Sequence, residues 1–499
     1  MKRFLTMGFM AIVSIHAMAQ VQTGENFAVT ETQQGKVRGY QHHDIFTFKG
    51  IPYAEAKRFE VAHAPKPWQG VRSAMTYGPV APLLSPTTQV QDESEFVFDH
   101  SWGYTNEDCM RVNVWTPGLK DGKKRPVLFW IHGGGFVAGS SQELPSYDGE
   151  NMSKRGDVVV VSINHRLNIL GYLDLAKYGD KYAHSANNSI LDIVAALEWV
   201  KANIANFGGD PNNVTIFGQS GGGAKVNVLM SMPKAKGLFH KAINQSGAFR
   251  TQYLNKALAQ EISAELLSVL NLNANQVDSL QKIDFAVLTE ASNKAIKIVN
   301  DRLKAKGQAV GGLMGLPWTP ELDGKDLPYE MFSKEALDLS KDIPLLIGTV
   351  KNEFMPSMFT NMSNANREQV EGYVKRQYKE KADAYIQAVK KAYPEDTKPT
   401  DLMDVDLMFR PGAVHEANLK SDLHMAPVYM YLFTWQSPIL DGKYKAMHCM
   451  ELPFVFDNIA RCEQMTAGGP AAQALAANMS NAWIEFARTG NPNHKGLPS

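Results

Sequence analysis

The sequence predicts an α/β protein with a large, mostly parallel central sheet that is covered by helices on both faces. From residue 125 onward, short runs rich in β-branched and aromatic residues alternate with helical patterns. Several of these runs are apolar on both faces, as central parallel strands are. No internal repeat, low-complexity tract or Pro/Gly/Ser linker divides the chain. We therefore expect residues 20–499 to form a single domain.

The expected strands are short, and helical patterns separate them. The strands occupy residues 125–132, 157–164, 214–218, 241–247, 343–350 and 427–435. Residues 189–209 predict a helix, because five apolar side chains fall on one face and Gly208-Gly209 ends the pattern; they are Ile190, Ile193, Val194, Leu197 and Ile204. The polar helical segment 255–310 is interpreted as an excursion above the sheet that, together with 355–425, roofs a pocket.

Composition and charge argue against several classes of partner. Of the 499 residues, 44% are hydrophobic and 20% are charged, which is typical of a globular protein. Lys+Arg and Asp+Glu both number 51, so no excess charge attracts nucleic acid, an anionic membrane or a polyacidic substrate. A partner selected by gross charge is therefore not expected.

The first residues have the order of a secretory signal peptide. Lys2 and Arg3 precede an apolar stretch that finishes on Ala17-Met18-Ala19, so residues 1–19 are the predicted signal and cleavage is expected after Ala19. A buried helix or a membrane anchor is the alternative, but the apolar run is short for a span. No later stretch is long and apolar enough to cross a bilayer. The predicted location is the periplasm or the outside of the cell.

Cysteine use allows at most one internal disulfide. The chain contains Cys109, Cys449 and Cys462, and an exported protein meets an oxidising compartment. Cys449 and Cys462 are close in sequence and form the predicted pair. Cys109 is then expected to be a small buried hydrophobic residue.

A glycine-flanked serine follows the third expected strand. In "VTIFGQSGGGAKVNVL" (214–229), Gly218 and Gly222 flank Ser220 in the spacing G-x-S-x-G, with a strand before and a helix after. A tight turn at the carboxyl end of a parallel strand holds a side chain out into an open crevice. The following helix aims free N–H groups at the negative charge that develops during acyl transfer. This context predicts that Ser220 is a nucleophile, whereas a plain glycine turn is the alternative.

A second glycine-rich turn follows the first expected strand. In "FWIHGGGFVAGS" (129–140), the strand runs directly into Gly133-Gly134-Gly135. Exposed amides in such a loop can point inward and bind an oxyanion. Two glycine-rich strand ends in one sheet, one of them carrying a serine, favour a catalytic site over a flexible turn.

Together these blocks resemble the type B carboxylesterases of the α/β-hydrolase superfamily, a group that includes cholinesterases, bacterial p-nitrobenzyl esterases and the non-enzymatic neuroligins. The similarity covers nearly all of the expected mature chain, residues 20–499. It is carried by the blocks 48–59, 106–117, 132–136 ("HGGGF"), 164–173, 203–223 ("NIANFGGDPNNVTIFGQSGGG"), 242–248, 348–354 and 448–458 ("HCMELPFVFDN"). The resemblance implies an α/β-hydrolase fold with helical insertions over the active site.

The resemblance also implies a catalytic triad in the chain order serine, acid, histidine. Glu353 follows the strand at 343–350 directly, whereas the rival carboxylate Asp323 lies in a Pro/Gly turn before that strand. His448 follows the last strand on a loop. His415 and His424 precede that strand and are expected to be surface or packing residues. The predicted triad is Ser220, Glu353 and His448.

Family positions give the supporting residues. The amides of Gly134, Gly135 and Gly221 correspond to the oxyanion hole. Ser246 and Glu451 match positions that steady the triad in relatives, although a serine after a strand and a glutamate near a histidine are also ordinary structural residues. Gln219, next to the nucleophile, is expected to support the triad as well.

Neither a metal nor a cofactor is expected. His132 belongs to the framework of the glycine loop in the family, and "HHD" at 42–44 resembles a metal cluster but is more typical of a solvated turn. No H-E-x-x-H or paired-cysteine spacing supports a metal site.

Four positions depart from the family pattern. Gln219 replaces a common glutamate, which removes an anion that would attract quaternary ammonium groups and argues against a choline ester. Gly221 replaces a common alanine but keeps the amide. Phe354 stands where glycine is frequent and is expected to crowd or line the pocket. Ala81 replaces the cysteine that bridges to the position of Cys109 in some relatives.

The sequence therefore predicts an exported serine carboxylesterase that acts through an acyl-enzyme. An amide, carbamate or lactone hydrolase is the alternative with the same machinery, because pocket shape decides among these substrates. A neuroligin-like binding module is disfavoured, because all three triad residue types are present.

Overall fold

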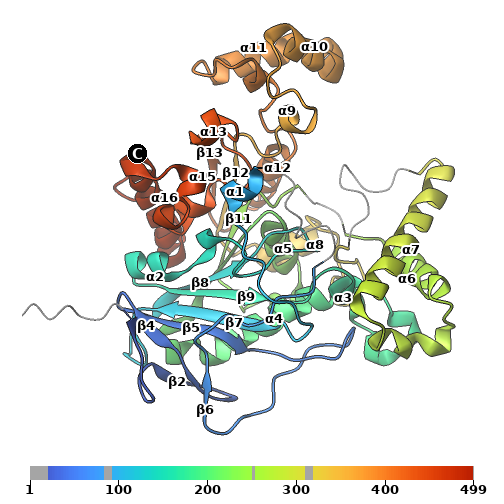
Figure 1. Ribbon diagram of the computed structural model, residues 1–499, viewed down its shortest axis with the longest axis vertical. Coiled ribbons are helices and arrows are strands. Elements are labelled where there is room, and N and C mark those ends of the chain that lie inside the picture. The colour runs from blue at the N-terminus through green and yellow to red at the C-terminus, as the bar shows by residue number, and fades with distance from the viewer. Residues whose placement is uncertain (1–20, 84–92, 250–252, 309–317, 498–499) are drawn as a thin grey trace, which may run out of the picture.

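A ten-stranded sheet forms the centre of the computed structural model, which describes residues 21–83, 93–249, 253–308 and 318–497 (Figure 1). From one edge to the other, the strands are β1 (Val21–Gln22), β4 (Tyr40–His42), β5 (Ile45–Pro52), β7 (Arg111–Thr116), β9 (Val159–Asn164), β8 (Arg125–Ile131), β10 (Gly209–Gln219), β11 (Lys241–Gln245), β12 (Leu345–Val350) and β13 (Val428–Phe433). A separate small sheet has the order β2 (Val29–Thr32), β3 (Gly35–Arg38), β6 (Val71–Ser73).

Six neighbouring strands are parallel, in the order β9, β8, β10, β11, β12, β13, and they are the six that the sequence predicts. Strands β1, β4, β5 and β7 join them through antiparallel pairings and extend the sheet on the β9 side. The sequence pattern did not reveal these N-terminal strands. The prediction of a large, mostly parallel sheet is confirmed.

Side chains of the sheet alternate between two apolar layers. In β8, Val127, Phe129 and Ile131 join one buried cluster, whereas Leu128 and Trp130 join the other. Because successive side chains of a strand point to opposite faces, both faces must be covered. The first layer holds α3 (Asn168–Tyr172), α4 (Asn188–Asn203), α5 (Gly221–Met230), α6 (Lys256–Val269), α7 (Phe285–Ala305) and α12 (Arg410–Ser421); the second holds α2 (Glu150–Gly156), α14 (Leu452–Val455), α15 (Glu463–Thr466) and α16 (Gly469–Thr489).

The helix expected over 189–209 forms as α4 and a following 3₁₀ turn, Ile204–Phe207. Its five predicted apolar residues are buried. Gly208 ends it at φ 74°, a left-handed conformation that glycine adopts without a steric penalty, and Gly209 begins β10. The end of the helix that the sequence predicts at Gly208-Gly209 is therefore confirmed.

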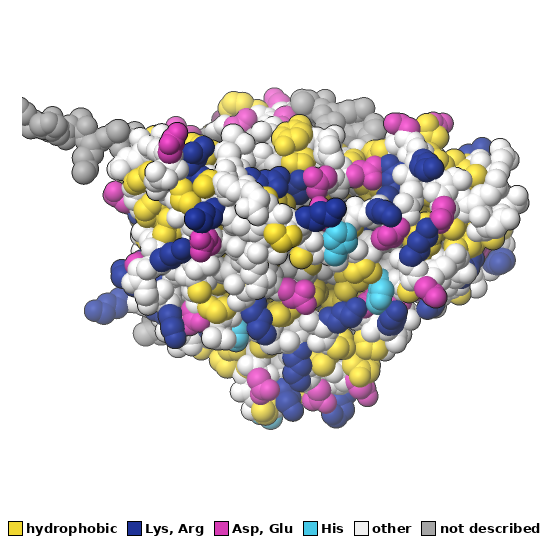
Figure 2. Space-filling model, turned by 90° about the horizontal axis from the view of Figure 1, so that it is seen from below, with side chains coloured by type: hydrophobic (Ala, Val, Ile, Leu, Met, Phe, Trp, Pro, Cys, Tyr) yellow, Lys and Arg dark blue, Asp and Glu magenta, His cyan; other side chains and the backbone are white. Residues whose placement is uncertain are grey.

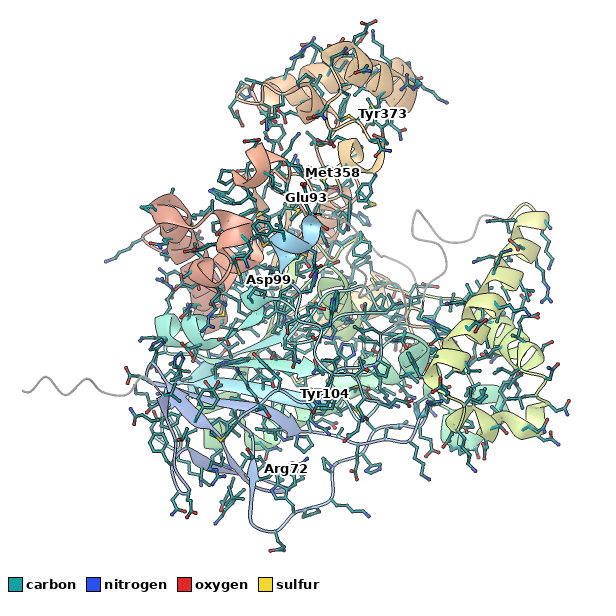
Figure 3. All side chains as sticks on the ribbon, in the orientation of Figure 1. Arg72, Glu93, Asp99, Tyr104, Met358 and Tyr373 are labelled. Carbon is teal, nitrogen blue, oxygen red and sulfur yellow. The ribbon has the colours of Figure 1, made fainter. Side chains whose placement is uncertain are left out.

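Two helical excursions extend from the sheet, as predicted. Helices α6 and α7 pack against each other, and Asn255 and Asp284 cap their N-termini (Figure 1). Helices α9 (Pro356–Phe359), α10 (Arg367–Tyr378) and α11 (Ala382–Ala392) stand at the opposite end from the small sheet. Figure 3 places Met358 and Tyr373 in this upper extension, with Glu93 and Asp99 beside α1 (Ser94–Phe98) below it. The remaining helices are α8 (Lys334–Ser340) and α13 (Ile439–Gly442).

Charges of both signs are mixed on the surface. Figure 2 shows Lys and Arg side chains interspersed with Asp and Glu on the face seen from below. This distribution agrees with the balanced composition. Within the part of the chain that the structure describes, none of the helices has the length and apolar character needed to cross a membrane. The predicted signal peptide, residues 1–19, lies outside the described residues.

The predicted disulfide between Cys449 and Cys462 is wrong. All three cysteines lie in described segments, and all are free thiols. The Cys449 thiol donates to Gln219 Oε1 at 3.2 Å, whereas Cys462 is buried in the apolar layer around α16. The two thiols therefore contact different groups and not each other. Cys109 is buried against Ala81 and Leu167, which confirms its expected packing role. Burial raises the pKa of its thiol to about 12.

Candidate active site

Ser220 occupies a strained turn between β10 and α5. Its backbone has φ 57° and ψ −124°, which a residue with a side chain rarely adopts. The turn is held by its backbone, since the Ser220 N–H donates to the Gln245 carbonyl at 2.8 Å. The flanking glycines permit close approach: a Cβ on Gly218 would lie 2.5 Å from the Gly222 carbonyl carbon, and a Cβ on Gly222 would overlap the Ile131 carbonyl oxygen. The sequence spacing therefore reflects a steric requirement.

The glycine loop after β8 lies directly on this turn. A Cβ on Gly133 would be 3.5 Å from the Ser220 Cβ, and a Cβ on Gly221 would overlap the Gly135 carbonyl oxygen. Gly134 and Gly135 have φ values of 78° and 63°. The replacement of alanine by Gly221 thus gives the loop room to approach the turn. The structure brings the three predicted oxyanion-hole residues together.

The N–H groups of this loop are available to a ligand. The Gly134 carbonyl accepts from the N–H groups of Val137 and Ala138, which closes the loop into a turn. Among the described residues, no acceptor takes a hydrogen bond from the N–H of Gly134, Gly135 or Gly221. Free N–H groups next to a nucleophilic hydroxyl are the elements of an oxyanion hole.

His448 and Glu353 form a direct pair. The His448 Nδ1 atom lies 2.5 Å from Glu353 Oε2, and the His448 backbone N–H donates to the Glu353 carbonyl at 3.0 Å. The other carboxylate oxygen accepts the Val350 N–H at 3.1 Å. The Glu353 side chain is fully buried and the His448 side chain is 12% exposed. This arrangement fixes the imidazole and leaves its Nε2 edge toward β10.

Gln219 connects this pair to the serine turn. Its Nε2 atom lies 3.2 Å from His448 Nε2, and it directly precedes Ser220 in the chain. The same amide nitrogen lies 3.4 Å from His448 Nδ1, so it faces the imidazole ring and does not lie along the lone pair of Nε2. A His448 proton on Nδ1 is donated to Glu353 and leaves the Nε2 lone pair as an acceptor. No hydrogen bond joins the Ser220 hydroxyl to His448 within the residues described here. Of the predicted triad, the structure pairs His448 with Glu353, and Gln219, the residue before Ser220, contacts this pair.

Ser246 and Glu451 lie behind the site. The Ser246 N–H donates to the Gly348 carbonyl at 2.8 Å, which ties the carboxyl end of β11 to that of β12. Glu451 Oε1 accepts from the Gln245 amide at 3.2 Å. Both side chains are buried, and the Ser246 hydroxyl and Glu451 Oε2 lack a hydrogen-bond partner among the described residues. Burial, and secondarily the charge of Glu353, raises the pKa of Glu451 from 4.5 to about 7.

The rival residues have other roles. Asp323 Oδ1 accepts the N–H groups of Lys325, Asp326 and Leu327, so this carboxylate closes its own turn. The His132 ring is buried and stacks on His165 with centroids 5.0 Å apart. Burial, reinforced by the nearby Lys225 charge, lowers the pKa of His132 well below its ordinary value. His132 is therefore part of the framework, as expected.

Aromatic rings cover His448. Phe354 stacks on the imidazole with centroids 4.7 Å apart, and Phe409 lies 5.2 Å from it. Phe354 is 37% exposed and its neighbour Phe359 is 71% exposed. The expectation that Phe354 crowds or lines the site agrees with this contact. Phe409 had no signal in the sequence, because it lies far from any motif.

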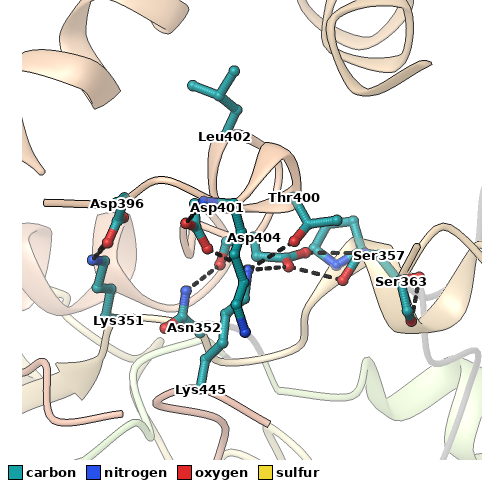
Figure 4. A network of polar contacts seen from close by, with 12 residues as sticks. Lys351, Asn352, Ser357, Ser363, Asp396, Thr400, Asp401, Leu402, Asp404 and Lys445 are labelled. Atoms are coloured by element: carbon teal, nitrogen blue, oxygen red, sulfur yellow. Dashed lines mark hydrogen bonds and ion pairs between the residues drawn. The ribbon is translucent and has the colours of Figure 1, made fainter. Parts of the chain in front are cut away.

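A buried polar network supports the loops that carry Glu353 and His448 (Figure 4). At its centre, Lys445 Nζ lies 2.7 Å from Asp401 Oδ1 and 2.8 Å from Asp404 Oδ2. Asp404 also accepts the Ser357 N–H and hydroxyl at 3.0 and 2.8 Å. These contacts tie the histidine loop to the base of the upper helical extension.

The same network reaches the acid loop. The Asn352 amide donates to the Asp404 carbonyl at 3.0 Å and accepts the Ala446 N–H at 3.2 Å. Lys351 Nζ lies 2.8 Å from Asp396. Because Asn352 directly precedes Glu353, its contacts hold the acid and histidine loops side by side. Buried charges that are fully paired fix one geometry more firmly than apolar packing does.

The "HHD" turn gathers a cluster away from this site. His42 Nδ1 and His43 Nδ1 lie 2.5 and 3.1 Å from the two oxygens of the buried Glu150. These three side chains have the donor types of a metal site. Arg461, however, lies 3.6 Å from the same carboxylate and already supplies a cation. We interpret the cluster as a hydrogen-bonded corner, which is more ordered than the solvated turn that the sequence suggests.

Comparisons with known proteins agree with this geometry. The carboxylesterase family model matches residues 26–499. The para-nitrobenzyl esterase of Bacillus subtilis is 37% identical over 484 residues, which cover 94% of this chain and 91% of that protein. The phenmedipham hydrolase of Pseudarthrobacter oxydans is 33% identical over 94% of this chain and 92% of its own length. A solved esterase of Clostridium hathewayi, described as able to hydrolyse aliphatic aromatic polyesters, has 37% identity and a TM-score of 0.82, with coverage of 95% and 92%.

The sheet and the serine turn define an α/β-hydrolase fold. Within that class, the chain belongs to the carboxylesterase family and is a carboxylic ester hydrolase.

The raised pKa of Glu451 predicts a pH-dependent stability difference. The folded protein keeps a proton that the unfolded chain releases between about pH 4.5 and 7, so this residue destabilises the fold increasingly as pH rises through that window. Glu451→Gln removes the effect. The quantity to compare is the unfolding free energy of the variant minus that of the unaltered protein, measured by urea denaturation at each pH. We expect this difference to be up to about 3 kcal/mol larger at pH 8 than at pH 5. A difference that is the same at both pH values, as expected for the exposed Glu290→Gln, would contradict this.

Proposed function

We propose that the protein is an exported serine carboxylesterase in which Ser220 is the nucleophile, His448 the general base and acid, and Glu353 the residue that orients the imidazole. The observation that carries the proposal is the strained Ser220 turn lying between the free amides of the glycine loop and the His448–Glu353 pair. A serine hydroxyl is a weak nucleophile at its normal pKa, so it requires an adjacent base.

The proposed reaction has two halves. His448 Nε2 accepts the Ser220 proton as the hydroxyl oxygen attacks the ester carbonyl, and the carbonyl oxygen becomes negative. The amides of Gly134, Gly135 and Gly221 stabilise that charge. His448 then gives the proton to the leaving alcohol, and water attacks the acyl-enzyme by the same route to release the acid.

In this scheme the Ser220 hydroxyl comes within hydrogen-bond distance of His448 Nε2 when substrate binds. The Gln219 amide faces the imidazole ring, 3.2 Å from Nε2 and 3.4 Å from Nδ1. Catalytic hydrogen bonds often form only in the substrate complex. Ser246 and Glu451 hold the strand ends beneath the site, and no cofactor enters any step.

Apolar esters fit the surroundings of His448 best. Phe354 and Phe359 present exposed rings on the side of the imidazole, and Gln219 provides no anion for a quaternary ammonium group. The relative described as hydrolysing aliphatic aromatic polyesters supports the same class. Amides, carbamates and lactones require the same nucleophile, so a substrate panel separates them.

The nucleophile assignment predicts the effect of one substitution. Ser220→Ala removes the attacking oxygen, so turnover of a p-nitrophenyl ester should fall by about 10⁴-fold or more while the circular dichroism spectrum is unchanged. Ser231→Ala, at the end of the same helix α5, is the matched control and should retain full activity. Substantial activity in Ser220→Ala would assign the nucleophile to another residue.

Export predicts a defined mature terminus. Residues 1–19 have the order of a signal peptide, and the family match begins at residue 26. Expression of the full chain in a Gram-negative host should place the esterase in the periplasmic or extracellular fraction, with Gln20 as its first residue by N-terminal sequencing. Activity confined to the cytosol on a chain that still begins at Met1 would overturn the export proposal.

A further inference from the structure

Lys225 is a buried cation that the proposed reaction does not use. It lies on α5, five residues after Ser220, and is 0% exposed. Lysine is almost never fully buried unless its charge is paired or strongly hydrogen-bonded, because desolvation of the ammonium is costly. A buried lysine this close to a nucleophile requires a physical reason.

The ammonium group lies under the glycine loop. Lys225 Nζ donates to the carbonyl oxygen of His132 at 3.2 Å and lies 5.8 Å from the centre of the Phe136 ring. His132 and Phe136 are the residues that bracket Gly133-Gly134-Gly135. The lysine therefore contacts the loop at both ends, on the side away from solvent.

Two imidazole rings lie near the ammonium group. The rings of His132 and His165 are buried and stacked, and burial followed by the charge of Lys225 lowers the pKa of each imidazole well below its ordinary value. Both rings are therefore neutral at physiological pH. The buried acid in this region is Glu143, whose carboxylate accepts the Ser140 N–H at 3.0 Å and the Tyr147 hydroxyl at 3.3 Å.

We propose that Lys225 is a positioning residue for the oxyanion hole. Its hydrogen bond fixes the His132–Gly133 peptide, and with it the direction of the loop amides that follow. Its positive charge, in a site of low dielectric, favours the negative oxygen that forms above the loop. This inference rests on the proposed function, and it explains why a charge is kept where an apolar side chain would be easier to bury.

Replacement of Lys225 should therefore affect the transition state more than substrate binding. Removal of a direct oxyanion-hole donor costs about 10²–10³-fold in kcat, so loss of this indirect support in Lys225→Met should lower kcat by about 10- to 100-fold with KM changed less than about threefold. Lys225→Arg keeps the charge and should retain more activity than Lys225→Met. Lys420→Met is the matched control, since Lys420 is another buried lysine that donates to a backbone carbonyl, that of Ser340, and it should leave kcat unchanged.

A transition-state analogue separates this role from general destabilisation. With an aryl trifluoromethyl ketone, the Ser220 oxygen bonds to the carbonyl carbon, the carbonyl electron pair moves to the oxygen, and His448 receives the proton. The inhibition constant of this ketone should rise in Lys225→Met by about the factor lost in kcat/KM. The inhibition constant of the corresponding product alcohol should not change. Equal effects on both inhibitors, or an effect on neither, would overturn the proposal.

A double variant tests whether Lys225 only neutralises Glu143. Glu143→Gln/Lys225→Met removes both buried charges, so it also carries the test if Lys225→Met alone does not fold. The proposal predicts that kcat in the double variant remains about 10- to 100-fold below that of the unaltered protein. Recovery to the unaltered value would show a purely structural counter-ion and refute the proposal. Ser220→Ala distinguishes failure of the Lys225 proposal from failure of the proposed function. If Ser220→Ala stays active, the proposed function fails, whatever the Lys225 variants show.

Discussion

Close backbone packing at the carboxyl ends of β8 and β10 is the constraint on which the rest of the site depends. Ser220 can hold its positive φ only because Gly218, Gly222 and the Ile131 carbonyl meet without side chains between them. The backbone of Gly135 in the glycine loop then packs directly against Gly221. Strain at one residue is sustained because the surrounding sheet over-determines its position. A single methyl group at Gly222 would separate the two strand ends that the chemistry requires.

The base and the acid reach this point through a different kind of interaction. Glu353 follows β12, and His448 comes from a loop after β13, so no local backbone geometry fixes their distance from Ser220. The Lys445 network holds these two loops together by joining both to Asp404. Such buried ion pairs contribute little net stability, because desolvation offsets the attraction. Here the ion pairs hold the acid and histidine loops in one position. In our proposal, Lys225 holds the glycine loop in the same way.

Much of this organisation was predictable from residue patterns. The six parallel strands are short apolar runs, and the Ser220, Glu353 and His448 positions each follow such a run, so their convergence at one edge follows from the fold class. Strands β1 and β4 were missed because they span only 2 and 3 residues and alternate too briefly to give a period. The longer β5 contains a register shift between Phe48 and Ile51, which interrupts its pattern. The Cys449–Cys462 pairing failed because closeness in sequence carries no information on side-chain direction. Lys225 and Phe409 gave no signal, since one reads as a solvated helix residue and the other as an ordinary apolar residue.

The central claim is that one hydroxyl, on Ser220, is activated by the groups gathered around it. The most direct measurement is mass spectrometric mapping of the protein after reaction with an aryl phosphonate, which transfers its phosphorus to an activated serine and expels the aryl alcohol. Our account predicts one adduct per chain, on the peptide that contains Ser220, with loss of esterase activity in proportion to labelling. An adduct on any other residue, or full labelling with activity retained, would contradict it.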